Sequence, residues 1–139
     1  MSISIWISIV ALIVATTSLV NGRKNNARLA RTAAVEKRSE AFAALVAARF
    51  TVSQVGFRLL TLEPYIRSEG SGDVAKLHEF IAEAKSLEAR VESDIQALYT
   101  LPLDVEAIEN HWEQATGNLA AIKQALEGIE MFERYVRGQ

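Results

Sequence analysis

The chain of 139 residues contains no cysteine, only two prolines and only seven glycines. The absence of cysteine excludes disulfide frameworks, cysteine-ligated zinc sites and thiol catalysis. The scarcity of proline and glycine argues against collagen-like, low-complexity and strongly disordered chains. A formal net charge of −2 disfavours a strongly basic nucleic-acid-binding protein. The length is that of one domain, so separate cofactor and substrate domains do not fit.

Charge is distributed unevenly along the chain. Residues 1–22 carry no charged side chain, and residues 23–40 carry six Lys or Arg against two Glu. Residues 41–139 carry nine Lys or Arg against fifteen Asp or Glu. We therefore divide the chain into an apolar segment (1–22), a basic juxtamembrane collar (23–40) and an acidic helical body (41–139).

The apolar segment predicts a transmembrane anchor. Thirteen of the eighteen residues from Ile3 to Val20 are apolar, and the other five are Ser or Thr. A helix of about twenty residues is about 30 Å long, which matches the hydrocarbon core of a bilayer. A signal peptide is a weaker interpretation, because no basic residue precedes the apolar run and no good cleavage site follows it. A buried strand, suggested by the alternation from Ile3 to Ile9, is also weaker, because the alternation stops at Val10 and no other segment resembles a partner strand. A buried helix of a soluble protein is weaker too, because such a helix is rarely this long and uncharged on every side.

The small residues of the anchor share one stripe. They follow one another at alternating spacings of four and three: Ser4, Ser8, Ala11, Ala15, Ser18 and Gly22. Such a stripe lets two membrane helices approach closely, and packing drives their association in lipid. The stripe predicts self-association or pairing with another membrane helix; chance placement in a segment rich in Ser and Ala is the alternative.

The basic collar predicts the orientation of the chain. Arg23, Lys24, Arg28 and Arg31 follow the apolar run directly. The positive-inside rule then places the body in the cytoplasm, as in a single-pass protein of a bacterial inner membrane. The collar also suits anionic lipid head groups, at about 1 kcal/mol per basic residue. A topology signal alone is the simpler interpretation.

The body predicts an all-α fold, an antiparallel three-helix bundle or coiled coil with helices at about 27–69, 73–100 and 103–137. Breaks fall at residues 68–73 and 100–104. The first helix either continues from the anchor as a rod of about 100 Å or breaks at Asn25-Asn26. Its apolar residues form a heptad seam: Leu45, Ala48, Val52, Val55, Leu59, Leu62 and Ile66.

The other two helices carry similar seams with one acidic interruption each. Asp94 falls on the seam of the second helix and Glu133 on the seam of the third. Pro102 suits the first turn of the third helix, and Asp104 suits the positive end of its dipole.

A second apolar face lies on the first body helix. If Leu45 and Val52 occupy heptad position a, then Phe50 and Phe57 occupy position f, opposite the seam, and Val46 and Leu60 flank them at b. An f position on a helix with one buried side is normally polar. The pattern predicts a face for self-association or for a partner helix. The alternative is a different register, with the core surrounding a central helix.

No constellation of residues predicts catalysis. His78 and His111 have no metal-ligand spacing around them, and no Glu-x-x-His pair supports a di-iron site. No phosphate-binding loop and no nucleophile elbow occur. We expect no enzyme, no catalytic or metal site, no cofactor and, because the body is acidic, no nucleic-acid partner.

The sequence therefore predicts a non-enzymatic, membrane-anchored helical interaction or scaffold module. Its expected partners are membrane lipid and either further copies in a homo-oligomer or another helical membrane protein. One alternative is an envelope-facing helical sensor or bridging protein of opposite orientation. Another is a small pore-forming oligomer of the anchor.

Overall fold

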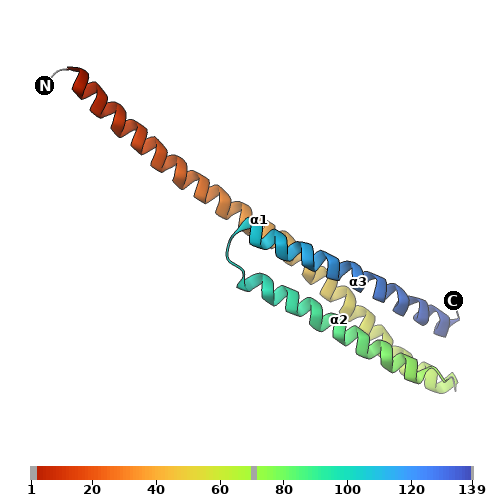
Figure 1. Ribbon diagram of the computed structural model, residues 1–139. Helices are drawn as coiled ribbons and strands as arrows, with labels where there is room; N and C mark the ends of the chain where they lie inside the picture. The colour runs from red at the N-terminus through yellow and green to blue at the C-terminus, as the bar shows by residue number, and fades with distance from the viewer. Residues whose placement is uncertain (1–2, 70–71, 139) are drawn as a thin grey trace.

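The computed structural model describes residues 3–69 and 72–138, and these residues form three helices without a strand among them (Figure 1). Helix α1 spans Ile3–Glu69, α2 spans Val74–Thr100 and α3 spans Val105–Arg137. The predicted all-α fold is confirmed. Helix α1 does not break at Asn25-Asn26, and its 67 residues form a rod of about 100 Å.

The C-terminal part of α1 and the other two helices form an antiparallel bundle. Helix α2 runs back along α1, and α3 reverses again to end far from the N-terminus of α1 (Figure 1). Helix α1 packs against both other helices, most extensively against α2, whereas α2 and α3 contact each other least. Helix α1 is therefore the central element of the bundle.

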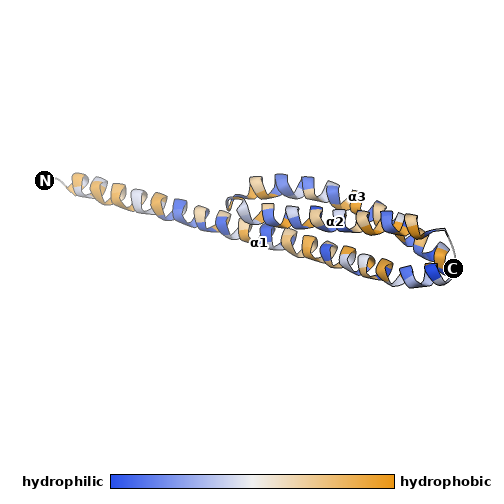
Figure 2. Cartoon of the chain, turned by 90° about the horizontal axis from the view of Figure 1, so that it is seen from below, coloured by the Kyte–Doolittle hydropathy of each residue, from blue (hydrophilic) through white to orange (hydrophobic). Residues whose placement is uncertain are grey.

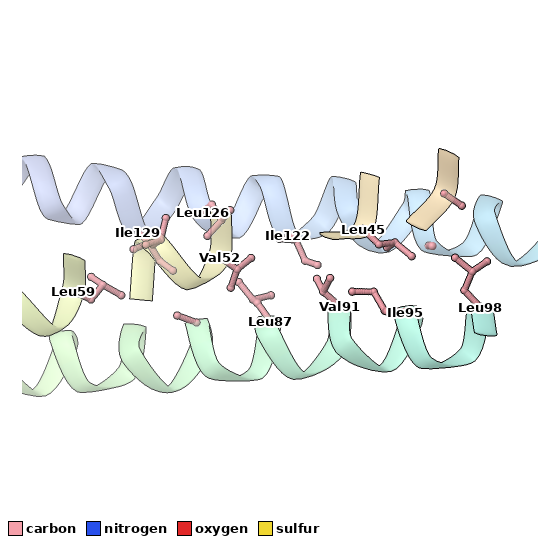
Figure 3. Close-up of a cluster of buried hydrophobic side chains, with 14 of the residues drawn as sticks. Leu45, Val52, Leu59, Leu87, Val91, Ile95, Leu98, Ile122, Leu126 and Ile129 are labelled. Atoms are coloured by element: carbon pink, nitrogen blue, oxygen red, sulfur yellow. The ribbon is translucent and has the colours of Figure 1, made fainter. Parts of the chain in front are cut away.

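The core follows the heptad pattern. Figure 3 shows side chains of all three helices interdigitating along the bundle axis. The buried residues of α1 are Ala34, Ala41, Leu45, Val52, Val55, Leu59, Leu62 and Ile66. They match the predicted seam, except that Ala48 is only half-buried. Burying one large aliphatic side chain contributes about 1.5–3 kcal/mol, so this register is strongly favoured over one rotated by a residue.

The two acidic residues on the seams are paired across helices. Asp94 of α2 accepts a hydrogen bond from the side-chain amide of Asn118 at 3.2 Å, and its backbone carbonyl lies 3.0 Å from Nε2 of His111. Glu133 of α3 lies 3.4 Å from Nε of Arg58 on α1. The seams tolerate these carboxylates because each lies at the edge of the core with a partner from another helix.

The start of α3 differs from the prediction. Pro102 does not lie in the first turn, because the helix begins at Val105. Asp104 is the N-cap, and its carboxylate accepts a hydrogen bond from the backbone N–H of Ala107 at 3.1 Å. This bond satisfies one of the free N–H groups of the first turn, which fixes the helix start at Asp104 rather than two residues earlier.

The apolar segment packs against nothing else in the described chain. Figure 2 shows mostly apolar turns in the N-terminal part of α1, followed by the polar collar. Residues 3–33 include no buried residue, and Ala34 is the first to be buried. This part of α1 is long and apolar enough to cross a membrane. The twelve residues from Arg23 to Ala34 then extend about 18 Å before the bundle begins.

Candidate interaction face

Phe50, Phe57 and Leu60 lie on the side of α1 that faces away from the core, and Val46 lies at the edge of this side. We call Val46, Phe50, Phe57 and Leu60 the outer face of α1. Phe50 is 63% exposed, Phe57 69% and Leu60 51%, whereas Val46 is half-buried against the core. Their positions follow from the register, because burial of heptad positions a and d turns f away from α2 and α3. The structure brings these four residues onto one surface.

The outer face lies in a strip without charge. Positions f, b and c of α1 from residue 43 to residue 61 include no charged residue. The other members of the strip are small or uncharged: Ala43, Ala47, Ser53, Gln54 and Thr61. All of these are exposed. An exposed helix surface with two phenylalanines and no charge is typical of a binding surface.

Helix α2 continues the outer face on one side. Phe57 and Leu60 share a shallow groove with Ile81 and Ala84 of α2. Gly56 of α1 faces Ala84 of α2 here, and a Cβ at this position would lie 3.8 Å from the Cβ of Ala84, an ordinary van der Waals contact.

An aromatic pair extends the same surface toward the collar. The rings of Phe42 on α1 and Tyr99 on α2 meet edge to face, with 5.4 Å between their centroids. Sequence reasoning missed this pair. A signal for Phe42 was present, since it precedes Val46 and Phe50 at spacings of four. Nothing in the pattern of α1 indicated Tyr99.

The cations beside the outer face are engaged within the chain. Arg49 donates a hydrogen bond from Nη1 to Oε2 of Glu92 at 2.6 Å. This bond, with a second from Gln96, lowers the pKa of Glu92 below its usual value. On the other side, Arg58 lies 3.7 Å from Glu130 and 3.4 Å from Glu133. These pairs hold α2 and α3 against α1 and leave the uncharged strip between them open.

The stripe residues of the anchor lie along an exposed part of α1. The hydroxyl of Ser8 donates to the backbone carbonyl of Ser4 at 2.9 Å, and that of Thr16 donates to Leu12 at 2.8 Å. Hydroxyls bonded in this way are compatible with a lipid environment. The four collar residues Arg23, Lys24, Arg28 and Arg31 are all exposed.

The histidines contribute to helix contacts. His78 of α2 lies 3.3 Å from Oε1 of Glu63 on α1, and Arg67 donates to the same oxygen at 2.7 Å. The bonds from His78 and then from Arg67 lower the pKa of Glu63. His111 joins α3 to the backbone of Asp94. Within residues 3–69 and 72–138, no three His, Cys, Asp or Glu side chains are grouped to hold a metal ion.

Comparison of the chain with protein-family models, with curated proteins and with solved structures finds no match. Function must therefore be argued from the surfaces of the chain itself.

Proposed function

We propose that the protein is a non-enzymatic, membrane-anchored helical interaction module. The observation that carries the proposal is the continuity of α1. One uninterrupted helix joins an apolar segment of membrane-spanning length to an exposed aromatic face. A single rigid element thus fixes the distance and the orientation of that face relative to the bilayer.

The anchoring part of the proposal rests on the exposure of the apolar segment. Large residues such as Trp6, Leu12 and Ile13 are more than half exposed, and no described part of the body covers them. In water this surface would oppose solubility, whereas in lipid it is favourable. Trp6, near one end of the segment, suits the membrane interface, where tryptophan is enriched.

The orientation rests on the collar. Basic residues follow the apolar segment directly and remain exposed around the helix. With the body in the cytoplasm, they lie at the negatively charged leaflet surface. The bundle then stands about 18 Å beyond the membrane surface, held by the exposed collar helix.

The interaction part rests on the outer face of α1. Two exposed phenylalanines and a leucine in an uncharged strip present an apolar surface that water solvates poorly. Aromatic residues of this kind often dominate the binding energy of an interface. A helix of a second chain, with an apolar face of its own, fits a straight helical surface.

The double substitution Phe50→Asp and Phe57→Asp tests this function. The full chain is solubilised in mild detergent from the membranes that contain it, and the mass of its complex is measured by light scattering. A matched control carries Gln114→Asp and Gln124→Asp, which add the same charge at exposed positions of α3.

We expect the parent and the control to run as complexes larger than one chain, and the double phenylalanine variant to run as a monomer with unchanged helical circular dichroism. A variant that keeps the full complex would contradict an interaction role for this face. Loss of helical signal would show instead that the two phenylalanines belong to the core.

A further inference from the structure

The small-residue stripe of the anchor and the outer face of the body occupy the same heptad positions. Counting back in sevens from Phe57 and Phe50 along α1, position f falls on Gly22, Ala15 and Ser8. Counting back from Leu60 and Val46, position b falls on Ser18, Ala11 and Ser4. Since α1 is unbroken from Ile3 to Glu69, these residues form one seam, which we call the f/b seam.

The f/b seam continues through the collar. Leu29 lies at f and is 67% exposed, and Asn25 lies at b. Glu36 is the one charged residue at any f or b position from residue 4 to residue 60, although the collar is rich in charge. Small or apolar residues recur at this spacing along the anchor and again along the body, a repeat that favours a left-handed supercoil with a partner helix, whereas the collar part of the seam also contains Thr32, Glu36 and Ser39.

We propose that the partner on this seam is a second copy of the chain, parallel and in register, with the two α1 helices paired from the anchor into the body. This inference rests on the proposed function and names its partner. Any partner must cross the bilayer in the same direction and keep the same repeat over the same length. A second copy meets both conditions by symmetry.

The residue types on the f/b seam differ between the anchor, which lies in lipid, and the body, which lies in water. Small residues occupy it in the anchor, where close approach of helices drives association in lipid. Phenylalanine and leucine occupy it in the body, where association in water depends on buried apolar area. Asn25 lies between the two regions, and paired asparagines at a seam position favour an in-register parallel pair.

The buried area indicates that a stable dimer needs contacts in both the anchor and the body. From their exposed fractions, Phe50, Phe57 and Leu60 together offer about 350 Å² per chain, since a phenylalanine buries about 200 Å². Two copies would bury about 700 Å², whereas a stable interface needs at least roughly 1,200 Å². Pairing of the anchors supplies the remaining contact and holds both bodies in one membrane.

Neither α2 nor α3 obstructs the seam. Helix α2 binds α1 through Arg49 at position e, and α3 binds it through Arg58 at position g. These ion pairs lie at the two edges of the arc formed by positions f, b and c. From residue 43 to residue 61 this arc is exposed except at Val46, and the hydroxyl of Ser53 donates to Oε1 of Glu88 on α2 at 3.2 Å.

Single-cysteine crosslinking of the full chain in its membrane tests the proposal, because the natural chain has no cysteine. Several residues spread along one helix can each form a disulfide with their own copies only where the two helices lie parallel and in register. The seam variants are Ser18→Cys, Thr32→Cys, Ser39→Cys and Ser53→Cys. The controls lie at exposed positions away from the seam: Ala27→Cys, Ala30→Cys and Thr51→Cys.

We expect all four seam variants to form covalent dimers at least about tenfold faster than the controls under mild oxidation. Equal rates at all positions would indicate random collision and overturn the proposal. Crosslinking at Ser18→Cys alone would also overturn it, because the bodies would then be apart. A third outcome is slow crosslinking at every position, with a complex that the double substitution Phe50→Asp and Phe57→Asp still abolishes. This outcome would mean that the outer face binds a different protein. That result would overturn the dimer and leave the proposed function standing.

Discussion

Leu59 and Leu60 are neighbours in α1 with opposite environments, and they provide a sharp test of its register. Leu59 is 0% exposed in the core, and Leu60 is 51% exposed on the outer face. Replacing Leu59 by alanine removes buried methyl groups and leaves a cavity, which costs about 2–5 kcal/mol of the free energy of unfolding. Replacing Leu60 removes a half-exposed side chain and leaves no cavity, so we expect a cost of about 1 kcal/mol or less.

The assay is urea unfolding of the full chain in detergent, followed by the fluorescence of Trp112. Every sample also carries Phe50→Asp and Phe57→Asp, so that contacts between copies do not contribute to the cost at Leu60. This tryptophan is half-buried on α3 and packs against the core. The second tryptophan, Trp6, lies in the apolar segment and is replaced by phenylalanine in every sample. With a urea dependence of about 2 kcal/mol per M, Leu59→Ala should lower the midpoint by about 1–2.5 M and Leu60→Ala by about 0.5 M or less.

Equal shifts for the two alanine variants, or a larger shift for Leu60→Ala, would refute the register. The outer face would then be part of the core, and both the interaction face and the f/b seam would lose their basis.

Three further predictions concern the bundle. Asp104→Ala should lower the free energy of unfolding by about 1 kcal/mol through loss of the N-cap, and Asp104→Asn should restore most of it; urea midpoints that do not differ would contradict the cap. Gly128→Ala should raise the free energy of unfolding by about 1 kcal/mol, because a Cβ there meets nothing within 4 Å in a helix interior; an unchanged or lower midpoint would contradict this environment. Arg49 lowers the pKa of Glu92 in the folded chain. This ion pair therefore stabilises the fold at pH values above 4.5, the usual pKa of the carboxylate, and its contribution is lost as the pH falls through the lowered pKa. Glu92→Gln should therefore lose less stability than the parent between about pH 6 and about pH 3, and parallel pH profiles of the two proteins would count against the ion pair.

The helices of the body could be predicted from the sequence because each carries its own apolar repeat. The positions from Leu45 to Ile66 specify which side of α1 is buried, and the same repeat turns Phe50 and Phe57 outward. Periodicity along one helix is enough for these conclusions, since side-chain direction in a helix follows from spacing alone.

Features that depend on how two helices are staggered could not be predicted. The contact of Phe42 with Tyr99 and the pairing of Arg58 with Glu133 both depend on the axial offset between two helices. The heptad repeat of a single helix does not specify that offset. The continuity of α1 was also open, because Asn25-Asn26 disfavours a helix by only about 1 kcal/mol in total. An unbroken helix avoids the cost of nucleating a second helix, which is larger than this penalty, since a nucleus has a statistical weight of about 10⁻³.

The account depends most directly on the location of the body relative to the membrane. The measurement is a pair of C-terminal fusions of the full chain in a bacterial host, one reporter active only in the cytoplasm and the other only outside it. The mass of each fusion is determined in the membrane fraction. We predict activity of the cytoplasmic reporter alone, on a membrane-bound fusion that keeps the apolar segment. Activity of the external reporter, or a fusion shortened by loss of the apolar segment, would contradict an anchored module that faces the cytoplasm.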